Sequence, residues 1–191
     1  MASVTALQGL RDKGKIKSGQ KVLIYGASGG VGTFAVQIAK SFGAEVTAVC
    51  STRNLEIVNS IGADQTIDYT KEDFTQKEER YDLILGVNGS NSIAAYKRAL
   101  KPNGTFVHVG GAESQMFQSI VLGPFSSISG SKKISTLLQK TNQNDLIYMK
   151  ELIEAEKVKP VIDKRYTLNE ISEAFKYFQE GHAQGKVVLT I

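Results

Sequence analysis

A glycine-rich segment at residues 26–32, Gly-Ala-Ser-Gly-Gly-Val-Gly, has the spacing of a loop whose backbone can surround a phosphate group. In register with G-x-G-x-x-G, the key positions are Ala27, Gly29 and Gly32, and Gly26 takes up the sharp turn of the replaced first glycine. Gly29 lets the backbone approach a pyrophosphate, and Gly32 lets the next helix pack closely on the preceding strand. The free N–H groups and the positive end of that helix complete an anion site. The segment predicts a dinucleotide-binding loop, with a tight turn that binds no ligand as the alternative.

The segment Cys50-Ser-Thr-Arg53, at the end of the next predicted strand, indicates which dinucleotide is bound. A site for NAD(H) needs Asp or Glu about 20 residues after the glycines to accept hydrogen bonds from the ribose. The first carboxylate here is Glu56, whereas Ser51 and Arg53 offer a hydroxyl and a guanidinium to a 2′-phosphate. We therefore expect NADP(H), with a solvated Arg53 as the alternative. The missing acid also weighs against a methyltransferase that uses S-adenosylmethionine.

Residues suited to metal binding or proton transfer are few. The chain has two histidines, His108 and His182, and one cysteine, Cys50, too few for a zinc site of the Cys/His kind. Cys50 is expected to be a plain buried thiol. His108 falls on a predicted buried strand, where a hydrogen-bonded core histidine is favoured over a proton relay. No metal site is predicted, and no catalytic residue is assigned.

Short apolar runs that alternate with amphipathic stretches predict the fold. The apolar runs, bounded by turn residues, are typical of strands buried on both faces, and the stretches between them have helical spacing. Strands that alternate with helices form right-handed crossovers and a parallel sheet. The sequence thus predicts an α/β protein with a doubly wound parallel Rossmann sheet of about six strands. The predicted strands are 21–25, 45–50, 65–68, 83–87, 105–109 and 133–138, and the predicted helices are 5–10, 31–42, 54–61 (capped by Asn54), 71–80 and 92–100, with a turn at 101–104 and a loop over 115–131.

The C-terminal part has a different pattern. An amphipathic helix at 146–153 is followed by an extended segment at 160–163, a helical stripe at 171–178 and a β-rich end at 186–191. These elements follow a sheet that is already complete, so they predict a C-terminal α+β appendage. We expect a dinucleotide-binding domain over 1–156 and a separate C-terminal segment over 157–191.

Composition agrees with a globular protein. Among the 191 residues 41% are hydrophobic and 22% charged, and the net charge is +4. The most basic stretch, 11–21, contains no aromatic residue to stack on bases, so no nucleic-acid partner is expected. No signal peptide and no membrane span are recognised, and a single cysteine suits a reducing compartment. These features predict a cytoplasmic protein without a membrane partner.

The motifs together resemble a known family. The glycine loop, followed by Ala35-Val-Gln-Ile-Ala-Lys40 and Gly43-Ala-Glu-Val46, is similar to the zinc-independent quinone-oxidoreductase (zeta-crystallin-like) branch of the medium-chain dehydrogenase/reductase superfamily. The resemblance covers nearly the whole chain. Further matching segments are Thr5-Ala-Leu-Gln8, Gly62-Ala-Asp64, Ile67-Asp-Tyr69, Val107-His-Val-Gly-Gly111 and Gly185-Lys-Val-Val188.

This resemblance implies NADPH binding and two-electron reduction of a small acceptor, either a quinone or an α,β-unsaturated carbonyl compound (enone). It assigns the cofactor-binding residues by position, with the pyrophosphate at the glycine loop, the 2′-phosphate at the end of the second strand and the nicotinamide at the end of the fifth. The family usually has Asp where this chain has Gly86. The implied residues are Ser28, Gly29, Gly30 and Val31 for the pyrophosphate, Ser51, Arg53 and Tyr69 for the 2′-phosphate, and Thr5, Val109 and Gly110 for the nicotinamide.

Family members also carry a GroES-like catalytic domain before the Thr5-Ala6 segment, near which this chain begins. The resemblance therefore implies that 1–191 is the cofactor-binding portion, whose segment from 157 onward would pack on that other domain. A cofactor-binding module without turnover of its own is the alternative function. A homodimer is expected, through either the edge of the sixth strand or the apolar residues of the C-terminal segment.

Overall fold

The computed structural model describes residues 1–78, 80–89, 91–110, 131–181 and 183–191. Its main feature is a six-stranded sheet with the strand order β3-β2-β1-β4-β5-β6, in which every pair is parallel. This is the doubly wound order, whose direction of winding reverses between β1 and β4. The fold prediction is confirmed. The strands are β1 (Lys21–Tyr25), β2 (Glu45–Cys50), β3 (Gln65–Asp68), β4 (Tyr81–Val87), β5 (Leu100–Val109) and β6 (Lys133–Thr136).

Helices cover both faces of this sheet, because successive side chains of each strand point to opposite faces. Val22 and Ile24 of β1 belong to the larger core cluster, which also holds the buried side chains of α1, α2, α3 and α6. Leu23 and Tyr25 belong to a second cluster with α4 and the short helix η3. The helices are α1 (Ala2–Gln8), which continues as the π-helix η1 (Gly9–Lys13), α2 (Gly32–Ser41), η2 (Thr52–Asn54), α3 (Leu55–Ser60), η3 (Phe74–Gln76), α4 (Ile93–Ala99) and α6 (Gln143–Glu154).

A buried polar cluster joins α1 to α6. Asp145 is 2% exposed, and its carboxylate accepts hydrogen bonds from Gln8 Nε2 at 2.6 Å and Arg11 Nη2 at 2.7 Å. Burial opposes ionisation, but these hydrogen bonds and one from Asn142 outweigh it and hold the pKa of Asp145 below its ordinary value. The cluster fixes the helix that carries Thr5.

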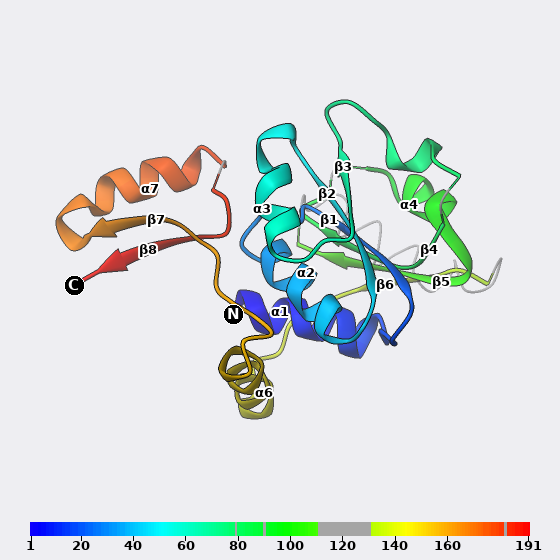
Figure 1. Ribbon diagram of the computed structural model, residues 1–191, viewed down its shortest axis with the longest axis horizontal. Helices are drawn as coiled ribbons and strands as arrows, with labels where there is room; N and C mark the ends of the chain where they lie inside the picture. Colours follow the sequence, from blue (N-terminus) through cyan, green and yellow to red (C-terminus); the bar gives the residue numbers. More distant parts are fainter. Residues whose placement is uncertain (79, 90, 111–130, 182) are drawn as a thin grey trace.

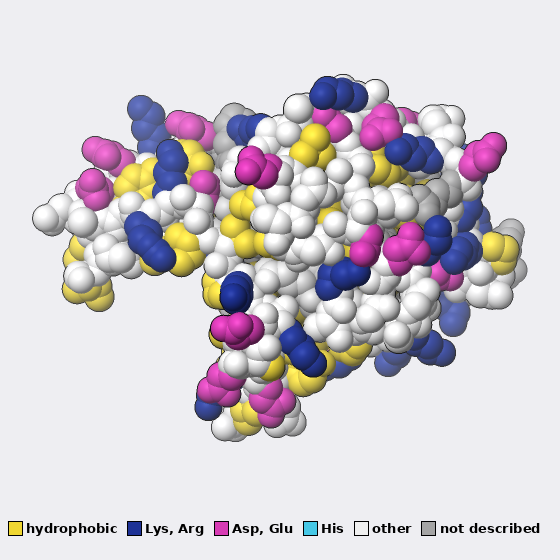
Figure 2. Space-filling view, viewed as in Figure 1, with side chains coloured by type: hydrophobic (Ala, Val, Ile, Leu, Met, Phe, Trp, Pro, Cys, Tyr) yellow, Lys and Arg dark blue, Asp and Glu magenta, His cyan; other side chains and the backbone are white. Residues whose placement is uncertain are grey.

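The C-terminal unit consists of β7 (Ile162–Thr167), η4 (Leu168–Glu170), α7 (Ile171–Gln179) and β8 (Lys186–Thr190). Strands β7 and β8 pair in parallel as a two-stranded sheet, and α7 is the crossover between them. The unit lies to one side of the main sheet (Figure 1). Phe175 and Phe178 of α7 are 59% and 64% exposed, and hydrophobic side chains gather on this unit and where it meets the main body (Figure 2).

Some expected elements differ from the structure. The α-helix predicted over 71–80 is wrong, because the described residues of this segment form only the short helix η3, whose cap is the Asp73 carboxylate accepting from Thr75 N at 2.9 Å. One buried side chain, Phe74, attaches the segment to the core, and it is only 2% exposed. An α-helix would instead bury a stripe of several apolar side chains. The turn predicted at 101–104 lies within β5, where pairing with β4 shifts register and Asn103 has a φ of 64°.

The remaining differences are smaller. The extended segment expected at 160–163 is displaced, since β7 begins at Ile162 and continues to Thr167. All but the last residue of the loop expected over 115–131 lies outside the described residues. In the part of the chain that the structure describes, no helix combines the length and apolarity needed to cross a membrane.

Candidate functional site

A cleft of about 1010 Å³ lies at the carboxyl ends of β1, β2, β4 and β5, between the main sheet and the C-terminal unit. In open α/β sheets, ligands bind outside the carboxyl ends of the strands, where the strand order reverses. All the predicted site residues except Ala27 and Gly32 line the cleft. Those that do are Thr5, Ser28, Gly29, Gly30, Val31, Ser51, Arg53, Tyr69, Val109 and Gly110.

The glycine loop forms the floor of the cleft and depends on close backbone contacts. Gly26 has a φ of +75°, and a Cβ atom added there would lie 2.3 Å from Val87 O. The loop then passes β2, whose Val49 O accepts from the N–H groups of Gly26 and Ala27, each at 3.1 Å. A Cβ at Gly32 would lie 2.1 Å from Gly26 O. Gly26 and Gly32 therefore shape the turn, as the sequence predicts.

Ala27 and Gly32 do not line the cleft but pack against the backbone of the glycine loop. Ala27 is fully buried, and Gly32 begins α2 against the loop backbone. Gly29 differs, because the nearest atom to a Cβ added there is Gly26 O at 3.6 Å, so this position has room on its cleft side.

The amino-terminal end of α2 is open toward the cleft. No side chain caps this helix, which begins immediately after Val31. Among the described residues, no acceptor is found for the backbone N–H of Gly30 or of Val31. Such unpaired donors at the positive end of a helix form an anion-binding site.

Asn54 joins the glycine loop to the end of β2. The side chain is 6% exposed, and its Nδ2 donates to Ser28 Oγ at 2.8 Å and to Ser51 Oγ at 3.2 Å. Asn54 occupies the N-cap position of α3, as predicted, but its side chain makes no cap hydrogen bond and binds these serines instead. Its Oδ1 accepts from Gln184 Nε2 of the C-terminal unit at 2.7 Å.

The end of the cleft near β2 and β3 carries Arg53 and Tyr69. Both side chains are exposed, and the Tyr69 ring stacks on Tyr25 with centroids 6.2 Å apart. Asp68, which the sequence argument did not consider, lies beside this end but does not line the cleft. Its carboxylate accepts from Thr52 Oγ1 and from Thr70 N and Oγ1, and these bonds lower the pKa of Asp68 to about 2.

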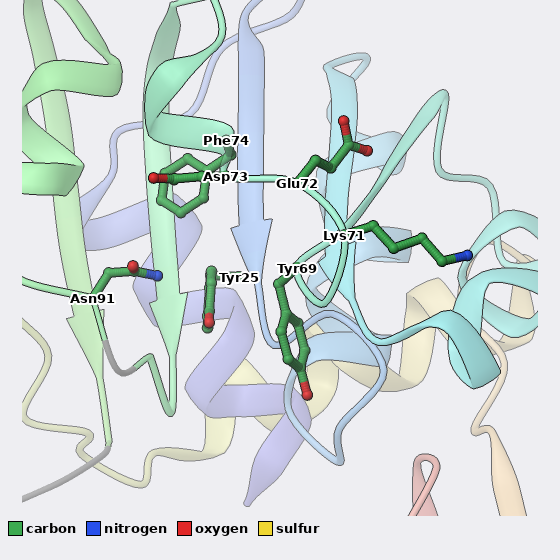
Figure 3. Close-up of a pocket in the computed structure, with 7 residues that line it drawn as sticks. All are labelled: Tyr25, Tyr69, Lys71, Glu72, Asp73, Phe74 and Asn91. Atoms are coloured by element: carbon green, nitrogen blue, oxygen red, sulfur yellow. The ribbon is translucent and has the colours of Figure 1, made fainter.

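A smaller cavity of about 430 Å³ adjoins the same tyrosines (Figure 3). Tyr25 and Tyr69 line both cavities, and the close-up shows the Lys71 side chain pointing away from them. Tyr25 also contacts Phe74, with centroids 5.9 Å apart, and packs edge-on against Tyr96 at 6.1 Å. These aromatic contacts hold Tyr25, which lines the cleft together with Tyr69.

The C-terminal unit supplies cleft residues that the sequence argument missed. Gly185 N donates to Ser28 O at 3.0 Å, so the start of β8 is hydrogen-bonded directly to the glycine loop. The Gly185-Lys-Val-Val188 segment is one of the family motifs in the sequence. The sequence around it does not show that it lies beside residues more than 150 positions earlier. Other missed lining residues are Tyr25, Gly26, Cys50, Asn54, Val87, Asn88, Phe178, Glu180, Gly181, Ala183, Lys186 and Val187.

Residues 61–189 match the family described as zinc-binding dehydrogenase. The chain belongs to this family. It is accordingly a member of the medium-chain dehydrogenase/reductase superfamily, which confirms the resemblance at that level.

Similar proteins include oxidoreductases from animals and plants. The mitochondrial NAD(P)H oxidoreductase RTN4IP1 of Mus musculus is 34% identical, over 100% of this chain and 52% of that protein. A chloroplast envelope quinone oxidoreductase homolog of Arabidopsis thaliana is also 34% identical, over 99% and 59%. The solved quinone oxidoreductase from Coxiella burnetii is 29% identical with a TM-score of 0.87, covering 100% of this chain and 58% of that one. The chain thus spans about half the length of the relatives it matches.

Cys50 and His108 are both buried. Burial raises the pKa of the Cys50 thiol to about 11, with a smaller contribution from the Asp68 charge, which agrees with a plain buried thiol. His108 is 3% exposed and does not line the cleft, and desolvation lowers its pKa. It is a core histidine, but its Nε2 has no hydrogen-bond partner within the described residues, contrary to expectation. Within those residues no group of three His, Cys, Asp or Glu side chains is arranged to hold a metal ion.

Proposed function

We propose that this chain is the NADP(H)-binding part of an oxidoreductase that transfers hydride to a quinone or an α,β-unsaturated carbonyl acceptor. The observation that carries the proposal is the open amino-terminal end of α2, which presents its unpaired N–H groups and the glycine loop to the large cleft. The names of the relatives support the redox chemistry, since they include NAD(P)H and quinone oxidoreductases and a 2-methylene-furan-3-one reductase of Solanum lycopersicum.

The chain's own residues would bind and orient the dinucleotide, which supplies the hydride when bound. The N–H groups of Gly30 and Val31 would bind the pyrophosphate, with Ser28 positioned beside them by Asn54. Thr5, Val109 and Gly110 also line the cleft, and they would lie next to the nicotinamide. Independence from zinc remains a proposal, and so does a cytoplasmic location, which the mitochondrial name of the mouse relative does not support.

The preference for NADP(H) over NAD(H) tests the cofactor proposal. We expect NADPH to bind tenfold to a hundredfold more tightly than NADH, because a charged hydrogen bond to the phosphate contributes about 1.5–3 kcal/mol. Arg53→Ala should remove most of this preference by weakening NADPH binding alone. Titration calorimetry with both cofactors measures it.

Arg98→Ala is the matched control for this experiment. Arg98 is an exposed arginine on α4 that does not line the cleft, so its removal lowers the net charge equally without touching the site. Equal dissociation constants of the wild-type chain for NADPH and NADH would refute the cofactor preference.

Turnover distinguishes an enzyme from a binding module. We expect the 191-residue chain to bind NADPH and yet to oxidise it slowly, because the relatives are about twice as long and the cleft remains open to water. The measurement is steady-state NADPH oxidation with a panel of quinones and enones. Rapid turnover by this chain alone would contradict the expectation and favour a complete catalytic site within residues 1–191.

Self-association remains a proposal, with a homodimer as the expected form. It is supported by the exposed apolar residues of the C-terminal unit, among them Phe175 and Phe178, and by the edge position of β6. Sedimentation equilibrium at micromolar concentration measures it. A single species near the chain mass of 20.7 kDa would argue for a monomer.

A further inference from the structure

Asn54 is a buried residue whose side chain joins the glycine loop, the end of β2 and the C-terminal unit. Both hydrogens of its Nδ2 amide are used, one by Ser28 Oγ at 2.8 Å and the other by Ser51 Oγ at 3.2 Å. Its Oδ1 accepts from Gln184 Nε2 at 2.7 Å, which holds the amide in this orientation. Hydrogen donation therefore runs from the C-terminal unit through Asn54 to the two serines.

The two serine hydroxyls act as acceptors toward Asn54. A serine hydroxyl has one hydrogen to donate, besides the lone pairs with which it accepts. Because Asn54 is the donor in both bonds, the hydrogen of each hydroxyl stays available for another acceptor. Among the described residues, no acceptor is found for the hydroxyl of Ser28 or of Ser51. Both serines line the cleft, so an anion bound in the cleft is the acceptor that this arrangement suits.

We propose that Asn54 is a positioning residue that directs the hydroxyl hydrogens of Ser28 and Ser51 toward the pyrophosphate and the 2′-phosphate of NADP(H). This inference rests on the proposed function. Ser28 belongs to the loop proposed for the pyrophosphate, and Ser51 follows β2 at the strand end proposed for the 2′-phosphate. One buried amide thus couples the two phosphate sites, and it acts on both through the serines.

An asparagine suits this role because its amide carries two hydrogens, one for each serine. A carboxylate of the same shape would accept from both hydroxyls and turn their hydrogens away from the cleft. Asn54 is 6% exposed, so water competes little for these bonds, and a hydrogen bond is stronger where the local dielectric constant is low. The amide therefore fixes the direction of both hydroxyls before a ligand binds.

A double-mutant cycle measured by titration calorimetry with NADPH tests this inference. It compares the wild-type chain, Asn54→Ala, the double variant Ser28→Ala/Ser51→Ala and the variant with all three substitutions. The double variant should bind NADPH at least about a hundredfold more weakly, since it loses two charged hydrogen bonds. Asn54→Ala should weaken binding about tenfold, because the hydroxyls can then turn away. In the chain that lacks both hydroxyls, Asn54→Ala should change the affinity by less than about twofold.

Smaller ligands separate the two phosphate sites. ADP-ribose contains the pyrophosphate without a 2′-phosphate, and adenosine 2′-monophosphate contains the 2′-phosphate without a pyrophosphate. Asn54→Ala should weaken the binding of both, by about threefold each, whereas Arg53→Ala should act only on ligands with a 2′-phosphate. Asn59→Ala is the matched control and should leave all affinities unchanged, because Asn59 is exposed on α3 and does not line the cleft.

Gln184→Met takes the place of Asn54→Ala if the latter does not fold. Gln184 does not line the cleft, and its replacement removes the hydrogen bond at Asn54 Oδ1, so the amide can turn its oxygen toward the serines. We expect NADPH to bind about threefold more weakly, and this loss should disappear in the chain that lacks both hydroxyls. Thermal unfolding of the ligand-free proteins shows which variants fold.

The outcomes separate this inference from the function on which it rests. If the effects of Asn54→Ala and of the double serine variant add, Asn54 does not act through the hydroxyls, and the inference is overturned while the proposed function stands. Unchanged NADPH affinity in folded Asn54→Ala, or in Gln184→Met where that variant replaces it, would overturn the inference as well. If the wild-type chain binds none of NADPH, ADP-ribose and adenosine 2′-monophosphate, the proposed function fails and this inference fails with it.

Discussion

Gly26→Ala is expected to lower the free energy of unfolding by about 3 kcal/mol or more, the sum of a backbone penalty and a steric one. Gly26 has a φ of +75°, a conformation that costs an alanine about 1–2 kcal/mol. The added Cβ would also lie 2.3 Å from Val87 O of the neighbouring strand, so β1 and β4 would have to separate at the base of the cleft. Urea unfolding followed by circular dichroism measures the change.

Gly19→Ala is the matched control, because Gly19 has nearly the same backbone conformation, with a φ of +76°, and no atom within 4 Å of an added Cβ. It should show the backbone penalty alone, about 1–2 kcal/mol. The difference between the two variants then measures the contact with Val87. Equal losses would mean that the loop moves away without cost, and the rigid base inferred for the cleft would be wrong.

Gly29→Asp is expected to lower the affinity for NADPH and NADH at least a hundredfold, which corresponds to about 2.7 kcal/mol. The position is open, since the nearest atom to an added Cβ is Gly26 O at 3.6 Å, and Gly29 lacks the positive φ of Gly26. The variant should therefore fold with little loss of stability. A carboxylate at this point would face the proposed pyrophosphate, and two like charges in contact repel strongly where water is partly excluded.

Gly29→Asn separates charge from size, because it has nearly the same shape without the negative charge. We expect it to bind more weakly than the wild-type chain and more tightly than Gly29→Asp. Calorimetry gives the affinities, and thermal unfolding of the ligand-free variants shows whether each one folds. If Gly29→Asp folds and still binds NADPH with wild-type affinity, the pyrophosphate does not lie at this loop.

Periodicity predicted the main sheet because each of its elements carries its own signal. Strand β1 is an apolar run, and α2 has an apolar stripe that ends before Gly43. Such patterns follow from burial on both faces of a parallel sheet and on one side of a helix. The segment 71–80 has no comparable stripe, and one buried side chain, Phe74, together with the Asp73 turn, decides its conformation. That choice depends on the pocket that α4 and Tyr25 provide, which local sequence does not reveal.

Asn54 shows that local sequence also does not reveal the side-chain contacts within the site. Its position before α3 is typical of a helix cap, but tertiary contacts with Ser28, Ser51 and Gln184 give its side chain three alternative partners. A buried amide makes the bonds that its surroundings offer, and two of these partners lie far away in sequence.

The sequence by itself determined the doubly wound sheet, the glycine loop and the absence of a carboxylate directly after β2, because each of these is encoded in a few consecutive residues. Only the tertiary structure decided which residues form the second wall of the cleft. The C-terminal unit returns to the glycine loop through Gly185 and Lys186, across more than 150 residues of chain, and Gln184 contacts Asn54, 130 residues away. A contact between segments so far apart depends on how the whole sheet and its helices pack, and no local pattern records it.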